Sequence, residues 1–322
     1  MTPTTQTSAA GRAQGAAATA APPEPPASRT RRPSRWLAWG FLAPVTIYLA
    51  AFYAYPLYRN VELSLREYSV RSFVQGGAPF AGLDNYRTVL TDPAFGSTLL
   101  HTMVFTAASL AFQFSIGMAL ALFFHQHFPL SRTLRALILI PWLLPLIVSA
   151  STWSWLLNSD SGLVNAALGV VGIEPVNWLT SPGWSLTSVI IANIWIGIPF
   201  NLVVLYSGLQ AIPAEMYEAS ALDGASSRQR FWWITLPLLR SVSMVTLLLG
   251  LIYTLKVFDI IWIMTRGGPT GSSATLATWS YRLGFGNLLP EFGPGAAIGN
   301  LLIVMALIAG LGYIRIERRQ HP

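Results

Sequence analysis

The chain has 322 residues, of which 53% are hydrophobic and only 10% are charged. A soluble domain is about one quarter charged, so this composition excludes a pair of ordinary soluble domains and favours a protein that lipid solvates. The net charge of +7 comes without the dense basic stripe of a nucleic-acid surface, and we expect no nucleic-acid partner. The absence of cysteine excludes disulfides and thiolate metal sites.

Lysine is almost absent: 19 of the 20 basic residues are arginine, and the single lysine, Lys256, lies in an apolar run. A phosphate-binding P-loop, G-x-x-x-x-G-K-[ST], needs a lysine that reaches the β- and γ-phosphates, and the chain has no such sequence. If ATP drives the work of this protein, another polypeptide must bind the ATP and its magnesium. We therefore expect this chain to be no enzyme and to hold no cofactor of its own.

Residues 1–34 are rich in alanine, proline and threonine and end in a cluster of arginines. Such a composition cannot bury a core, which predicts a disordered cytoplasmic tail before a single transmembrane domain over residues 35–322. A cleaved signal peptide is the alternative, since basic residues precede an apolar stretch. Against it, Trp36–Tyr58 is a run of 23 uncharged residues, which is longer than the apolar region of a typical signal peptide.

Six segments are long and apolar enough to cross a bilayer, which takes about 20 residues of helix. Because backbone polar groups find no water in lipid, these segments must be helices, and the predicted fold is an all-α, polytopic membrane protein. Prolines inside the segments should kink or start helices. The predicted spans are about Trp36–Tyr58, Leu99–Phe124, Ala136–Leu157, Trp184–Gly208, Ser241–Met264 and Ala296–Ile314.

The arginines between the spans predict the orientation. With the N-terminus inside the cell, 13 arginines fall in cytoplasmic segments and six in outer loops. Cytoplasmic loops carry an excess of basic residues, so we expect both termini to lie inside.

The loop between the fourth and fifth spans, about residues 209–240, contains a predicted short helix. Pro213 suits its first turn, and Gly224 is a natural C-terminal stop. Met216, Ala219 and Leu222 recur every third residue, so the helix would expose one small apolar face. Such a helix can dock into a groove on a partner, or it can simply lie on the bilayer surface.

This loop resembles a known family. Glu218-Ala219-Ser220, Gly224 and Ile234-Thr-Leu-Pro237 match the E-A-A-x-x-x-G-x(9)-I-x-L-P signature of binding-protein-dependent ABC importer permeases, with serine in place of the second alanine. The resemblance implies a type I importer permease fold and a coupling helix that docks on an ATP-binding subunit. The residues implied in that contact are Glu218, Ala219, Ser220, Asp223 and Gly224.

Three further motifs resemble carbohydrate-uptake permeases of the maltose/glycerol-phosphate type. They are Phe80–Tyr86 (F-x-G-L-x-N-Y), Phe258-Asp259 with Met264–Pro269, and Ser272–Tyr281. These motifs mark the first of two permease subunits. The implied partners are a second homologous permease, two ATP-binding subunits and an extracytoplasmic solute-binding protein, around a multi-pass chain in a bacterial plasma membrane.

One face of the fourth span is a candidate for the substrate pathway. Asn193, Gly197 and Phe200 fall at helical spacing, and an amide, a glycine and an aromatic ring suit a sugar. They lie in a stretch that resembles the N-x-W-x-G-x-P-[YF] motif of the maltose-type subunit. The same resemblance places Gly250, Thr254 and Val257 on the facing part of the fifth span. The alternative is a helix-packing seam of small residues.

Lys256 and Asp259 are ionisable residues within the fifth predicted span, where a charge is costly. At three-residue spacing they would share a helix face, either as a neutralised pair or as a substrate contact. Lys256 could also counter the charge of a glycerol-phosphate-type cargo. The four histidines form no metal-ligand cluster in the sequence, so no metal site is expected.

Two other classes of protein fit less well. A membrane-embedded transferase would need catalytic side chains clustered at a span end. A secondary carrier would need internal inverted repeats, and neither feature stands out in the sequence. The sequence does not identify which sugar or polyol is carried.

Overall fold

The computed structural model describes residues 35–126 and 128–318, so the tail predicted for residues 1–34 lies outside the described part. The chain divides into two compact units, and the division falls between Phe52 and Tyr53. The first contains α1 (Arg35–Leu49), which carries Pro44 in its interior, and most of the π-helical turn η1 (Ala50–Ala54).

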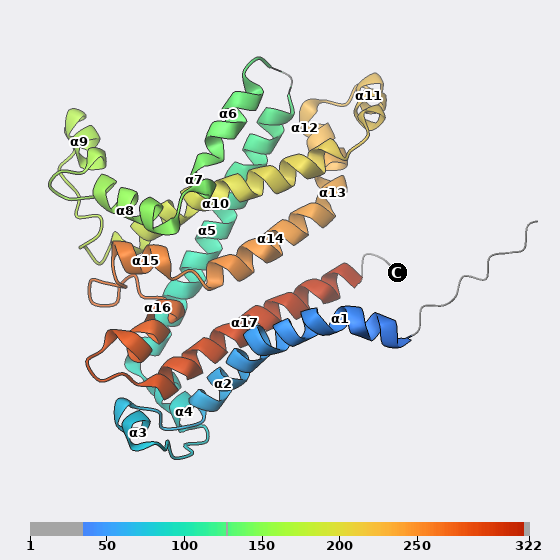
Figure 1. Ribbon diagram of the computed structural model, residues 1–322. Coiled ribbons are helices and arrows are strands. Elements are labelled where there is room, and N and C mark those ends of the chain that lie inside the picture. The colour runs from blue at the N-terminus through green and yellow to red at the C-terminus, as the bar shows by residue number, and fades with distance from the viewer. Residues whose placement is uncertain (1–34, 127, 319–322) are drawn as a thin grey trace, which may run out of the picture. The chain divides into compact units, whose positions relative to one another are not determined.

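The second unit is built of helices joined by turns, with no named strand among its described residues. Figure 1 labels most of these elements. In chain order they are α2 (Tyr55–Ser64), α3 (Val70–Gln75), α4 (Asp84–Thr91), α5 (Pro93–His125), α6 (Ser131–Ile138), α7 (Ile140–Leu143), α8 (Leu146–Leu156), α9 (Leu163–Val170), α10 (Ser185–Gln210), α11 (Ala214–Leu222), α12 (Ser227–Arg230), η2 (Phe231–Thr235), α13 (Leu236–Leu238), α14 (Arg240–Leu255), α15 (Asp259–Met264), α16 (Leu276–Tyr281), η3 (Arg282–Gly286) and α17 (Phe292–Arg318).

Four helices in the described part of the chain are long and apolar enough to cross a membrane. They are Trp39–Ser64, Pro93–His125, Ser185–Gln210 and Phe292–Glu317. A fifth span is obtained if the bent pair Ser227–Leu238 and Arg240–Leu255 is counted as one. The chain is therefore a multi-pass, helical membrane protein.

Two of the six predicted spans are interrupted, and in the first of them the prediction that prolines start or kink helices is confirmed at Pro141 and Pro145. The segment predicted over 136–157 is divided among α6, α7 and α8, with Leu144 extended at φ −73° and ψ 142°. Proline disfavours helical geometry in the residue before it, so Pro145 breaks the run at Leu144. The segment predicted over 241–264 breaks between the end of α14 at Leu255 and the start of α15 at Asp259.

Helices α5 and α10 cross in Figure 1 and pack closely at Gly117 of α5 and Gly197 of α10. A β-carbon on Gly117 of α5 would lie 2.5 Å from the β-carbon of Asn201 on α10. Near this crossing, a cluster of fully buried leucines closes the space between α5, α10 and the start of α14. Its α10 members are Leu202, Leu205 and Leu209.

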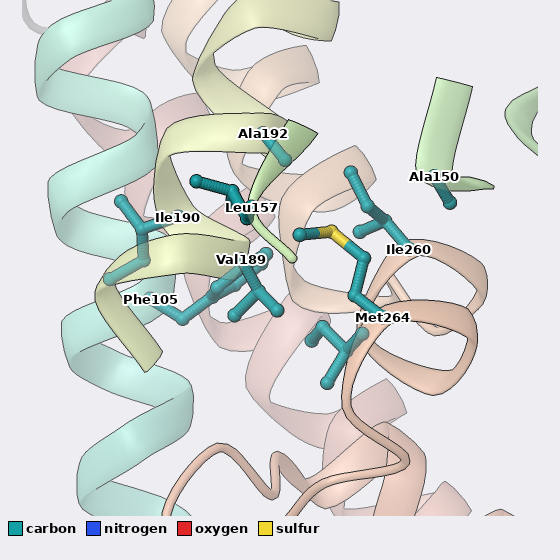
Figure 2. Packing of buried hydrophobic residues seen from close by; sticks show 9 residues of the cluster. Phe105, Ala150, Leu157, Val189, Ile190, Ala192, Ile260 and Met264 are labelled. Carbon is teal, nitrogen blue, oxygen red and sulfur yellow. The ribbon is translucent and has the colours of Figure 1, made fainter. Parts of the chain in front are cut away.

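A second apolar cluster joins α5, α8, α10 and α15. Figure 2 shows Val189 and Phe105 close together, with Ile260 and Met264 of α15 facing them. Since Ile260 and Met264 lie beyond the break in the fifth predicted span, this packing favours a separate α15 over a continued α14.

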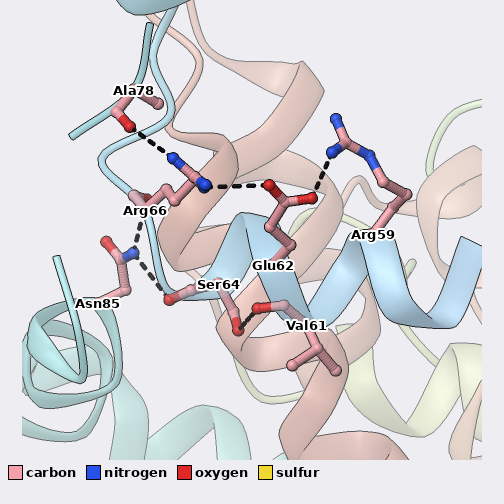
Figure 3. A network of polar contacts seen from close by, with 7 residues as sticks. All are labelled: Arg59, Val61, Glu62, Ser64, Arg66, Ala78 and Asn85. Atoms are coloured by element: carbon pink, nitrogen blue, oxygen red, sulfur yellow. Dashed lines mark hydrogen bonds and ion pairs between the residues drawn. The ribbon is translucent and has the colours of Figure 1, made fainter. Parts of the chain in front are cut away.

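A polar network ties the end of α2 to α4 and α17. Asn85 Nδ2 donates to the carbonyl oxygens of Ser64 and Arg66, each at 2.9 Å (Figure 3). Tyr86 and Asn300 extend the network, because Asn300 Nδ2 lies 2.9 Å from both Ser64 Oγ and the Tyr86 hydroxyl. The last two residues of the F-x-G-L-x-N-Y motif therefore join three helices.

We predict that Asn85→Ala destabilises the protein by about 1–3 kcal/mol, because two carbonyl oxygens at the end of α2 lose their donor in a buried place. Thermal unfolding of the purified protein in detergent measures the effect. Ser97→Ala is the control, since its exposed hydroxyl donates only to Ala94 one turn away. Equal unfolding midpoints for the two variants would contradict the prediction.

Candidate functional site

The short helix predicted between the fourth and fifth spans is confirmed as α11. It begins at Ala214, directly after Pro213, and its last residue is Leu222. Gly224 follows with φ +78°, a left-handed conformation that glycine adopts without strain and that ends the helix.

One side of α11 is anchored and the other is free. The Tyr217 hydroxyl lies 3.0 Å from Oγ1 of Thr235, which is buried, so this side is tied to the segment that leads into α14. Ser220 is half-buried and donates to the Tyr217 carbonyl oxygen at 2.9 Å. The other four predicted coupling residues are exposed: Glu218, Ala219, Asp223 and Gly224.

Apolar side chains on α11 are also exposed. Leu222 is 90% exposed and Met216 is 47% exposed, as the three-residue spacing predicts for an open apolar face. An exposed leucine next to exposed carboxylates on an anchored helix gives a surface that a partner can bury.

The structure brings all eight predicted pathway residues to one cavity of about 470 Å³. Helices α5, α7, α8, α10, α14 and α15 each contribute to its lining. The predicted residues that line it are Asn193, Gly197, Phe200, Gly250, Thr254, Lys256, Val257 and Asp259; those that the sequence did not single out are Gln113, Pro141, Trp142, Leu144, Leu146, Ile196, Tyr253 and Ile260.

Gln113 and Asn193 form one polar part of the lining. Gln113 Nε2 donates to the backbone carbonyl oxygen of Asn193 at 2.9 Å, across the α5–α10 contact. The Asn193 side chain is only 6% exposed, and its Nδ2 has no hydrogen-bond partner in the described part of the chain. This nitrogen is itself buried, so a ligand hydroxyl in the cavity can bond to it only after the Asn193 side chain turns toward the cavity.

Three aromatic rings surround the same space. The Phe200 ring centroid lies 6.4 Å from that of Trp142 and 6.4 Å from that of Tyr253. Lys256 Nζ lies 4.9 Å from the centroid of the Tyr253 ring, within the range of a cation–π contact. The cavity therefore offers apolar ring faces beside amide and charged groups.

The prediction that Lys256 and Asp259 share a helix face is wrong. Lys256 is the C-cap of α14, and Asp259 is the first residue of α15. Between them the Phe258 ring packs 5.5 Å from Trp262 and 4.5 Å from Tyr281, so aromatic packing replaces helical continuity. Both charged residues line the cavity, but they form no ion pair with each other in the described structure.

The family of proteins described as "Binding-protein-dependent transport system inner membrane component" matches residues 113–322 of this chain. The chain belongs to that family. This identification agrees with the coupling signature and places the cavity and α11 in the matched region.

Named relatives of this permease are similar over most of its length. It is 39% identical to the trehalose/maltose transport system permease protein MalF of Thermococcus litoralis, over 74% of this chain and 80% of the relative. It is 33% identical to the sulfoquinovosyl glycerol transport system permease protein SmoG of Agrobacterium fabrum, over 88% of this chain and 94% of the relative.

The fold also matches a chain of a solved bacterial ABC transporter "involved in the import of the acidic polysaccharide alginate". The TM-score is 0.76 at 26% identity, over 89% of this permease and 96% of that chain. The type I importer permease fold is therefore established.

Sequence reasoning missed Gln113, Trp142 and Tyr253. A signal existed for Tyr253, which lies three residues after Gly250 and three before Lys256, and so on their helix face. No such signal existed for Gln113, because only the α5–α10 packing of the permease brings it to Asn193.

We predict that Gly197→Ala destabilises the permease by about 1–3 kcal/mol through overpacking. The new β-carbon would lie 2.2 Å from Gln113 Cδ, whose amide is held by its bond to Asn193. Thermal unfolding in detergent measures the loss.

The double variant Gly197→Ala with Gln113→Ala should recover part of the stability, because it removes the colliding amide. Gly169→Ala is the control, since a β-carbon there meets nothing within 4 Å. A Gly197→Ala protein as stable as the control would contradict the close contact.

Proposed function

We propose that this chain is the transmembrane subunit of an ATP-driven importer that carries a sugar or related carbohydrate through the cavity between α10 and α14. The observation that carries the proposal is the lining of that cavity, where aromatic rings stand beside the amide residues Gln113 and Asn193. A sugar presents both apolar ring faces and hydroxyl groups, so it can use both kinds of wall.

The similarity to named transporters supports the same cargo class. The relatives reported above are named for trehalose or maltose and for sulfoquinovosyl glycerol, and the solved importer is described with alginate. These cargoes differ in size and charge but are all carbohydrates.

The exposed side of α11 is the proposed site of coupling to ATP hydrolysis. Glu218, Ala219, Ser220, Asp223 and Gly224 would enter a cleft on one of two ATP-binding subunits, which would supply the ATP and magnesium sites. The Tyr217–Thr235 contact would pass the movement of α11 to the start of α14. Opening and closing of the cavity would then follow ATP binding and hydrolysis.

The proposed assembly is that of a plasma-membrane importer in a bacterium. It has a second homologous permease beside this chain and an extracytoplasmic binding protein that delivers the cargo. A solved alginate transporter in complex with its periplasmic protein, similar in fold to this chain, supports such a partner. In this assembly the chain crosses the membrane six times, with both termini in the cytoplasm.

A cargo with an acidic group, such as a glycerol-phosphate-type compound, is the second candidate. Lys256 favours it, because its ammonium group lines the cavity and forms none of the ion pairs in the described structure. Asp259 lines the same cavity and opposes an anion, so the neutral carbohydrate remains the first candidate.

Coupling can be tested at α11. We predict that Glu218→Lys and Gly224→Asp abolish ATP-driven uptake while the protein still inserts and assembles, because both change the exposed docking surface. Uptake into proteoliposomes and ATP hydrolysis by the assembled transporter are measured together.

Gly224→Asn is the matched control for this test. Asparagine tolerates the left-handed backbone at φ +78° and has nearly the shape of aspartate without its charge, so it should retain more uptake. Normal uptake and normal coupling in both charged variants would contradict the docking role.

The cargo site can be tested at Phe200. We predict that Phe200→Ala raises the cargo concentration for half-maximal uptake by about tenfold, because a ring face is lost from the cavity. Uptake of a panel of labelled sugars by the assembled transporter measures it. Phe112→Ala on the exposed side of α5 is the control, and equal effects of the two substitutions would contradict the assignment.

A further inference from the structure

The segment between α11 and α14 turns sharply before the membrane span begins. Residues Ser227–Leu238 form one helical run, made of α12, η2 and α13, that is bent by 68° from Arg240–Leu255. The run therefore does not continue the direction of the span, and a helix in that position can lie along the membrane surface. Proline at position 237 and the cap at Leu239 lie at the bend.

This run is basic and aromatic. Arg228 and Arg230 lie in its first turn, and the whole chain has no carboxylate between Asp223 and Asp259. Trp233 is 81% exposed and Trp232 is 54% exposed. Arginine on the polar side of a helix and tryptophan on the apolar side are typical of helices that lie in the membrane interface.

Arg228, Trp232 and Trp233 line one recess. A cavity of about 400 Å³ is lined by Ser226, Arg228, Gln229, Trp232 and Trp233. A reciprocal capping box holds two of these residues: Gln229 Oε1 accepts from the Ser226 backbone amide at 2.8 Å, and Ser226 Oγ accepts from the Gln229 backbone amide at 3.3 Å. Arg228 takes part in none of the ion pairs in the described structure.

We propose that this recess binds the phosphate headgroup of an anionic phospholipid. The Arg228 guanidinium can hold phosphate oxygens with two parallel hydrogen bonds, and the two indoles would contact the glycerol and upper acyl region. The lipid belongs to the cytoplasmic leaflet in the orientation of the proposed function, but the binding itself needs no assumption about the cargo.

The recess is linked to the coupling helix. Thr235, in the same helical run, holds the Tyr217 hydroxyl of α11 at 3.0 Å. A lipid that fixes the run in the interface therefore also fixes the anchored side of α11. An anionic lipid is expected to support coupled ATP hydrolysis as well as to bind.

The test uses the assembled transporter in nanodiscs of phosphatidylcholine with increasing phosphatidylglycerol. Native mass spectrometry counts the phosphatidylglycerol molecules that remain bound, and ATP hydrolysis is measured on the same samples. We expect Arg228→Gln to weaken phosphatidylglycerol retention by about fivefold, the contribution of one basic residue near an anionic membrane surface. Arg228→Lys should retain part of the binding.

Arg315→Gln on α17 is the matched control, because it removes an exposed arginine outside the recess. Equal retention by the Arg228→Gln and Arg315→Gln proteins would overturn the proposal. Displacement of the lipid by inorganic phosphate alone would also overturn it, since that result assigns the recess to a free anion. A protein that keeps lipid binding but carries no sugar would overturn the proposed cargo and leave this site standing.

Discussion

The backbones of α5 and α10 approach each other closely, and this contact positions the helices that carry the cavity. In lipid, an apolar side chain gains little free energy by moving from the acyl chains into a helix–helix contact. Helices therefore associate through tight packing and hydrogen bonds. At Gly117 and Gly197 no room exists for a β-carbon between α5 and α10. The close approach of the two helices brings Gln113 against Asn193. This contact contributes polar groups to the cavity lining.

Helix α10, which lines the cavity, also leads to the coupling segment. Helix α10 runs without interruption from Ser185 to Gln210 and carries Asn193 on its way, and α11 begins four residues after it ends. Helix α14 leads back from the bend at Leu239 to the cavity residues Gly250 and Thr254. Two helices therefore join the cavity to the surface proposed to meet an ATP-binding subunit.

Local signals in the sequence were sufficient for α11, where proline begins the helix and Gly224 ends it with a positive φ. Helical spacing together with the resemblance to maltose-type permeases also found residues that meet at one cavity. Pro145 marked the break at Leu144, but no local signal marked the break at Lys256–Phe258, where the apolar composition of a span conceals it. Phe258 packs on Tyr281, which is distant in sequence, and no periodicity reports such a contact. Trp142 was missed for a similar reason, because it lies on the broken third segment and reaches Phe200 only in the folded chain.

We propose that the free side of α11 faces the cytoplasm and meets an ATP-binding subunit. Since the chain has no cysteine, a single cysteine in place of Ala219 reports on this surface alone. Its labelling by a membrane-impermeant maleimide is measured in right-side-out and inside-out vesicles, with and without the ATP-binding subunits. We expect labelling only in inside-out vesicles and protection when those subunits are bound. Labelling from the outside, or no protection in a complex that transports, would contradict it.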